Sequence, residues 1–159
     1  MNENNLEKII NNIVGDAIVK EVMSLKLAVK LIETVEEKAA EMGLAVVVAV
    51  SDASGRPVAV HCMDGAYHGS FDVAVNKTYT STAFQMSTAK LSRLCQPGQD
   101  LYGLRFSNNG KVMILGGGEP LMVGRTMIGA LGVSGGSAQE DSDLAAYGAS
   151  ALKEVIKCL

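Results

Sequence analysis

Several residue types are scarce in this chain of 159 residues, and each scarcity excludes a class of protein. There is no tryptophan and aromatic residues make up only 4% of the chain, so the core must be built from aliphatic side chains. The 3 cysteines are scattered without a Cys-x-x-Cys pair, which argues against a zinc site or a disulfide framework and favours a reducing compartment. No apolar run reaches the roughly 20 residues of a membrane span, and the start of the chain lacks the layout of a signal peptide. We therefore expect a cytoplasmic protein with no membrane partner.

The charge balance excludes a further class. The formal net charge is −3 and there is no basic stripe, so a nucleic-acid partner is not expected. Hydrophobic residues make up 48% of the chain and charged residues 19%, which is typical of a globular protein. The length predicts one domain with a real core, and the 17 glycines predict many tight turns and close backbone approaches.

The first 22 residues are predicted to form an amphipathic helix that is an extension of the domain. Their apolar residues recur at helical spacing: Leu6, Ile9, Ile10, Ile13, Val14, Ala17 and Ile18. A second helical pattern follows at once, with Ser24 as its N-cap and Gly43 as its stop, and it is complete by itself. We therefore divide the chain into an extension over residues 1–22 and a domain over residues 23–159. Amphipathic spacing alone leaves two roles open for the extension: packing on the core or an oligomer interface, or docking into a groove of a partner protein.

The rest of the chain predicts an α+β domain. An apolar β-branched run and a second strand, joined by a short polar turn, favour an antiparallel hairpin. A helix follows that Ser70 can cap, and the last helix begins at Ser137, which has capping-box spacing to Glu140. The expected strands cover residues 44–50, 57–63, 111–115, 119–123 and 126–133. This order favours an antiparallel sheet of about five strands with helices packed against it.

Short motifs, in unbroken order from about Leu25 to the end of the chain, carry a family resemblance. They are Ala49-Val-Ser-Asp52, Met63-Asp-Gly-Ala66, Leu101-Tyr-Gly-Leu104, Gly116-Gly-Gly118-x-Pro120 and Gly129-Ala-Leu-Gly-Val-Ser-Gly-Gly136. The chain resembles the GlcG/HbpS-like family, which is also seen as the C-terminal domain of PduO-type cobalamin adenosyltransferases. The resemblance implies a profilin-like α-β-α domain that assembles into homo-oligomers, with haem or corrinoid binding in some members and no settled reaction. Cys62 stands where an Arg often precedes Met-Asp-Gly, so no anion-binding role is carried over to that position.

The resemblance also suggests a role for the extension. In PduO-like settings, proteins are housed in bacterial microcompartments, and cargo often carries a short terminal amphipathic helix. Residues 1–22 look like such a targeting peptide. The implied partner is a shell or cargo protein of a microcompartment, and the implied location is its lumen.

The residues themselves predict a ligand pocket around the start of the third helix. Lys77 lies among small residues, so an inward-pointing ammonium needs an anionic ligand or a carboxylate, and Asp64, Asp72 and Asp141 are available. His68 is in a glycine-flanked loop, where functional residues often lie, whereas His61 is on a strand. The predicted pocket is lined by Asp64, Gly65, Tyr67, His68, Ser70 and Lys77, and faces Gly117, Gly118, Gly135 and Gly136. The expected cofactor is haem or cobalamin, with His68 or Cys62 as candidate haem ligands.

Three hypotheses for the function follow. The first is an accessory, non-enzymatic protein that binds a small anionic or tetrapyrrole-like molecule and is linked to a catabolic pathway. The second is an enzyme acting on a small polar metabolite, in which Lys77 works with Asp64 or Asp141. The third is a structural or cargo component recruited by residues 1–22.

Overall fold

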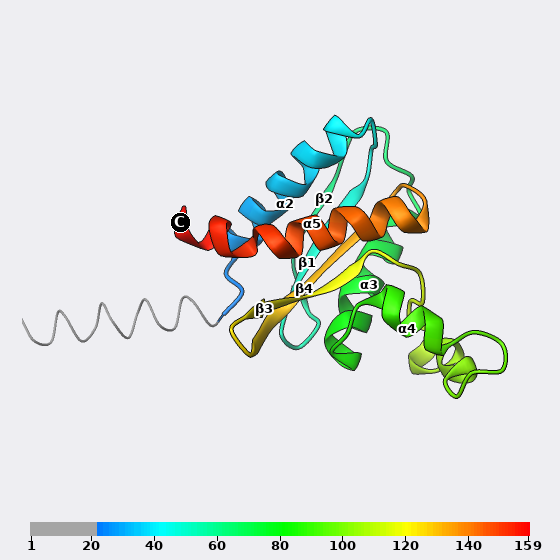
Figure 1. The fold of residues 1–159 in the computed structure, drawn as a ribbon. Coiled ribbons are helices and arrows are strands. Elements are labelled where there is room, and N and C mark those ends of the chain that lie inside the picture. Colours follow the sequence, from blue (N-terminus) through cyan, green and yellow to red (C-terminus); the bar gives the residue numbers. More distant parts are fainter. Residues whose placement is uncertain (1–21) are drawn as a thin grey trace, which may run out of the picture.

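The computed structural model describes residues 22–159, which form three layers with a sheet between helices (Figure 1). The sheet is antiparallel, in the order β2-β1-β4-β3. Its strands are β1 (Val47–Asp52), β2 (Pro57–Cys62), β3 (Gly118–Val123) and β4 (Thr126–Ser134). Helices α2 (Leu25–Glu41) and α5 (Ala138–Lys157) pack together over one face, and α3 (Ser70–Phe84) covers the other. The predicted α-β-α fold is confirmed.

The helix expected over residues 1–22 lies outside the described residues, apart from Val22, and the boundary between extension and domain stays a prediction. Within residues 22–159, none of the helices combines the length and the apolarity needed to cross a membrane.

The sheet has four strands in the described part of the chain, where about five were predicted. Residues 111–115 are not a strand. The Met113 backbone N–H donates to the Thr80 hydroxyl of α3 at 2.8 Å, so the segment is tied to a helix instead of to a neighbouring strand. Val112 is buried in a small separate cluster with Leu91 and Cys95. An apolar run of this length fits such a satellite core as well as a strand.

The third helix is shorter than expected. The composition of the sequence favours a helix that continues to about residues 87–91, but α3 ends at Phe84, and Gln85 takes a left-handed conformation with φ 51°. A separate helix, α4 (Thr88–Leu94), starts after the Ser87 hydroxyl, which accepts from the Lys90 N–H at 3.3 Å. Two 3-10 turns follow, η1 (Tyr102–Phe106) and η2 (Asn108–Gly110).

Helix ends explain why the remaining boundaries could be predicted. Ser24 caps α2 by accepting from the Leu27 N–H at 3.1 Å, as expected. The predicted capping box at the start of α5 is also present, with Ser137 and Glu140 bonded reciprocally. Ser70 does not cap α3. It is the first residue of that helix, and Gly69 occupies the N-cap position.

Alternation along β1 builds a core on both faces of the sheet. Val48 and Val50 belong to the main core with α2 and α5, whereas Val47 and Ala49 pack against Ala74 of α3. Gly132 of β4 lies so close to α3 that a Cβ there would overlap the Ala74 carbonyl oxygen. This close approach places Lys77, one turn further along α3, against the end of β4.

Candidate ligand-binding site

Lys77 is sealed inside the protein, with a side chain that is 1% exposed. Its Nζ donates to Oδ2 of Asp141 at 2.8 Å and to the carbonyl oxygen of Val133 at 2.6 Å. Burial lowers the pKa of Lys77, and the hydrogen bond and charge of Asp141 oppose that shift. Of the three carboxylates considered from the sequence, the structure thus pairs Lys77 with Asp141.

The ion pair joins three elements. Lys77 belongs to α3, Val133 to β4, and Asp141 to the first turn of α5. The second oxygen of Asp141, Oδ1, accepts from the Gly136 N–H at 2.9 Å. Each partner therefore has hydrogen bonds that satisfy it inside the fold, which is the condition for a buried ion pair to be tolerated. The arrangement is a structural clamp between the layers.

Gly117 and Gly118 close over this clamp. A Cβ at Gly117 would lie 2.8 Å from the Lys77 Nζ and 2.6 Å from the Val133 carbonyl oxygen. The Gly118 N–H donates to the Thr88 hydroxyl at 2.9 Å, inside the protein. The glycines let the chain cross directly above the ion pair, because any side chain there would collide with it.

The predicted pocket residues therefore separate into two groups. Lys77, Gly117 and Gly136 lie against Asp141, and Gly118 lies beside them against Thr88 and Ser81. Asp64, Gly65, Tyr67 and His68 lie on the exposed loop between β2 and α3. Gly65 and Gly135 both approach Ala45, two residues before β1. A Cβ at Gly65 would lie 3.9 Å from the Ala45 Cβ, and a Cβ at Gly135 would lie 2.6 Å from the Ala45 carbonyl oxygen. Ser70 is buried at the end of the loop.

Two participants were not predicted from the sequence. The Val133 carbonyl oxygen carries no sequence signal, because any residue type would supply it. Thr88 follows Ser87, a typical cap residue, but nothing in the sequence indicates that the Thr88 hydroxyl accepts from the distant Gly118 N–H.

The loop between β2 and α3 presents its side chains to solvent. A turn closes it, in which the Ala66 N–H donates to the Met63 carbonyl at 3.0 Å and Gly65 takes φ +87°. Tyr67 is 75% exposed, and His68 is exposed beside it. Phe71, in the first turn of α3, is 45% exposed. Residues 67–71 thus expose two aromatic rings and an imidazole, and the exposed free thiol of Cys62 comes just before the loop.

The other histidine is held differently. His61 lies on β2 with its Nδ1 3.2 Å from each carboxylate oxygen of Glu36 on α2. Such a contact orients the ring. In residues 22–159, no cluster of three or more His, Cys, Asp or Glu residues is arranged to hold a bare metal ion.

Comparison with known proteins identifies the family. The model of the family described as "Haem degrading protein HbpS-like" matches residues 23–150. This chain belongs to the HbpS-like family. The resemblance inferred from the sequence motifs is confirmed.

This HbpS-like chain is similar in sequence to an uncharacterized bacterial protein and to part of a corrinoid adenosyltransferase. It is 38% identical over 123 residues to an uncharacterized 15.0 kDa protein of the dhaT-dhaS intergenic region of Citrobacter freundii, covering 77% of this chain and 87% of that protein. It is 39% identical over 109 residues to the corrinoid adenosyltransferase PduO of Salmonella typhimurium. That match covers 69% of this chain but 32% of PduO, so the chain spans about a third of that enzyme.

A solved structure extends the comparison. The crystal structure of a PduOC:heme complex has a TM-score of 0.78 and 35% identity to this chain, covering 82% of this chain and 94% of that one. Haem iron in proteins is held by His, Cys, Met or Tyr side chains. Cys62, Tyr67 and His68 offer three of these donor types on an exposed surface, and Phe71 adds a ring face. The donor chemistry of the loop therefore fits haem.

Proposed function

We propose that this protein is an accessory haem-binding protein that holds the tetrapyrrole against the loop between β2 and α3. The observation that carries the proposal is the exposure of Tyr67, His68 and Phe71 on one short segment, in a member of a family whose relatives include a haem complex. Exposed rings and an imidazole whose side chains make no hydrogen bond within residues 22–159 suit a flat apolar ligand with a metal centre. When bound, haem would supply redox or gas-binding chemistry. The chain's own residues would bind it and set its access to water.

In this proposal Lys77 anchors the site and does not touch the ligand. Its ammonium donates to Asp141 and Val133 and its side chain is 1% exposed, so it is not open to a ligand at the surface. The clamp fixes α3 against β4 and thereby fixes the start of α3, where Ser70 and Phe71 lie. The propionates of a bound haem would therefore interact with water or with a cation other than Lys77.

Spectral titration tests the proposal. Purified full chain is titrated with haemin and, separately, with cobalamin, and absorbance is followed. We expect a shifted Soret band that saturates at a fixed haemin-to-protein ratio. Saturable binding of cobalamin without haemin binding would replace haem by a corrinoid as the ligand, and no saturable binding of either would reject a tetrapyrrole role. A Soret band that forms and then decays under reducing conditions would make the protein haem-degrading.

A second candidate function uses the extension. Because the HbpS-like match begins at residue 23, residues 1–22 are surplus to the family domain, and we propose that they recruit the protein to a microcompartment shell. The relationship to PduO favours this setting. Deleting residues 1–22 should release the protein from the shell fraction, and an unchanged location would reject recruitment.

A catalytic role for Lys77 is the alternative to binding. It needs the ammonium or its neutral amine to reach a substrate, whereas the side chain is 1% exposed and fully paired. Catalysis by Lys77 would be supported if Lys77→Met lost turnover with a candidate metabolite and kept its melting temperature.

A further inference from the structure

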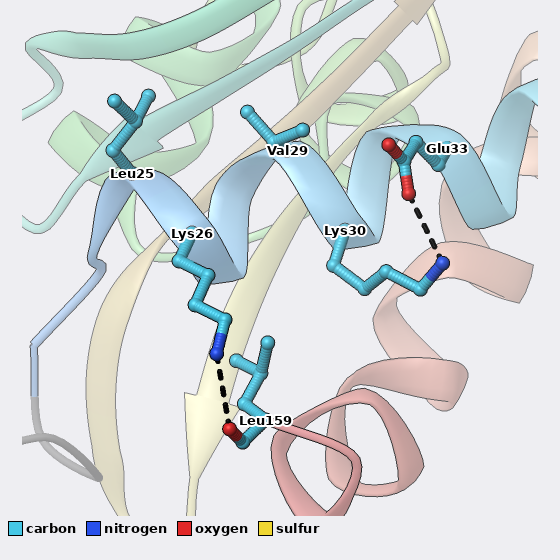
Figure 2. Close-up of a pocket in the computed structure, with 6 residues that line it drawn as sticks. All are labelled: Leu25, Lys26, Val29, Lys30, Glu33 and Leu159. Carbon is cyan, nitrogen blue, oxygen red and sulfur yellow. Dashed lines mark hydrogen bonds and ion pairs between the residues drawn. The ribbon is translucent and has the colours of Figure 1, made fainter.

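A groove of about 530 Å³ lies between the first half of α2 and the end of α5 (Figure 2). It is lined by Leu25, Lys26, Val29, Lys30, Glu33 and Leu159. Figure 2 shows Leu25 and Val29 along one edge of α2, with Lys26 and Lys30 extending toward the end of α5, where Leu159 lies. The groove thus has an apolar wall and a charged rim.

The apolar wall is not part of the core. Leu25 is 62% exposed and Leu159 is 41% exposed, although both are large aliphatic side chains. Leu25 and Val29 are one helical turn apart and belong to none of the hydrophobic clusters of the domain. On the rim, the Lys26 Nζ donates to the Leu159 carbonyl at 3.1 Å, and Lys30 lies 3.0 Å from Glu33. An exposed apolar wall with a polar rim is typical of an interaction site.

The chain itself carries a segment that suits this groove. Residues 1–21 lie outside the described part of the structure and join it at Val22, three residues before Leu25. Their apolar residues recur at helical spacing, so a helix formed there would carry an apolar stripe. Glu7 is three residues before Ile10, and Asp16 is three residues after Ile13, which places carboxylates beside the stripe. These carboxylates match the rim lysines.

The geometry of the connection also favours this occupant. Residues 22–24 would be the link between the segment and α2, and links of 2–5 residues are typical of two antiparallel helices. The groove follows α2 from Leu25 to Glu33, roughly 12 Å at 1.5 Å per residue. In this antiparallel arrangement the residues next to the link lie beside Leu25, so roughly residues 13–21 would lie along the groove.

We propose that residues 1–21 fold back as an amphipathic helix and dock in the groove between α2 and α5 of their own chain. The apolar stripe then meets Leu25, Val29 and Leu159. Docking hides the same stripe that a shell or cargo protein would need, so the groove competes with any such partner. The proposal is independent of haem binding.

Cross-linking to the native Cys158 tests the docking. Cys158 is exposed and directly precedes Leu159 of the groove. In a Cys62→Ser background, Ala17→Cys places a thiol on the stripe near the Lys26 end of the groove, and Gly15→Cys places one on the opposite face as the matched control. Mild oxidation should give an intrachain disulfide with Ala17→Cys at least about tenfold faster than with Gly15→Cys, since a docked helix holds one face near Cys158.

Two other results would overturn the proposal. Equal rates for the two variants mean that the segment is not docked with its stripe on this groove. A disulfide between two chains, seen as a dimer on a non-reducing gel, assigns the groove to the segment of a neighbouring copy. The Ala17→Cys variant with Cys158→Ser should give neither of these disulfides.

Hydrogen exchange supplies a readout that needs no cysteine. We expect amides of residues 6–18 in the full chain to exchange about tenfold more slowly than in Leu25→Gln/Val29→Gln, because docking protects a helix from opening. Met42→Gln, an exposed apolar residue at the far end of α2, is the control and should leave the exchange unchanged. Equal exchange in all three proteins contradicts docking at this wall.

Discussion

At the scale of single residues, the buried pair of Lys77 and Asp141 is the strongest polar feature of the domain. The sequence indicated that Lys77 needs an anion and that three carboxylates could supply it. In the structure Asp141 is the partner, because the first turn of α5 follows directly after the end of β4, where Lys77 lies. That choice depends on how the layers pack, which residue spacing does not encode. The loop residues Tyr67 and His68 could be placed from the sequence alone, because glycines on a polar stretch predict an exposed loop.

Removing one partner of the pair should be costly. Lys77→Met leaves the Asp141 carboxylate buried without its cation, so we expect the free energy of unfolding to fall by about 3–5 kcal/mol. Urea denaturation at neutral pH measures it. The double variant Lys77→Met/Asp141→Leu should recover most of the loss, since no charge is then buried. A single variant as stable as the unmodified chain would contradict the structural role.

The contribution of Glu119 on β3 to stability should fall as the pH rises, the opposite of the usual behaviour of a carboxyl group. Burial raises its pKa above 4.5, so the folded protein holds this proton more tightly than the unfolded chain. Between pH 4.5 and the raised pKa the folded state binds more protons, and the contribution of Glu119 to stability is lost as pH rises. Glu119→Gln should therefore gain stability over the unmodified chain on going from pH 4.5 to about pH 7. Urea midpoints of both proteins at the two pH values measure the difference. A difference independent of pH would contradict the raised pKa.

At the scale of elements, helices with caps were predictable and the segment between α3 and β3 was not. Ser24 and Ser137 mark helix starts through hydrogen bonds within four residues, so the sequence carries the whole signal. The segment 111–115 has the composition of a strand, but its backbone bonds to Thr80 and its Val112 enters a satellite cluster. Long-range contacts decide such a run, and a local pattern does not contain them.

The close contact of α3 with β4 gives an element-scale prediction. A methyl group at Gly132 would overlap the Ala74 carbonyl oxygen, so Gly132→Ala must push α3 from the sheet. We expect the free energy of unfolding to fall by roughly 1–3 kcal/mol, as in other overpacked sites. Gly103→Ala, which has open space around it, is the matched control and should change stability little. Chemical denaturation of both variants compares them, and equal stability would mean that α3 does not lie this close.

At the scale of the whole molecule, the α-β-α architecture puts the two proposed surfaces in different places. The loop proposed to bind haem leads from β2 into α3, which covers one face of the sheet. The groove proposed for residues 1–21 lies between α2 and α5 over the opposite face (Figure 1). A ligand on one surface therefore need not disturb the other. The motif pattern was enough to predict this architecture, but neither the groove nor the sealed state of Lys77 could be read from it, because both arise from packing between distant segments.

Haemin titration of loop variants tests most directly whether haem binds at the loop between β2 and α3. Tyr67→Ala/His68→Ala removes two exposed candidate contacts at little structural cost, and His61→Ala, which removes the histidine paired with Glu36, is the control. We expect saturable haemin binding by the unmodified chain and by His61→Ala. The haemin affinity of the loop double variant should be at least about tenfold lower, a loss of ~1.4 kcal/mol. Unchanged affinity in the loop double variant, or no saturable binding by the unmodified chain, would contradict haem binding at this loop.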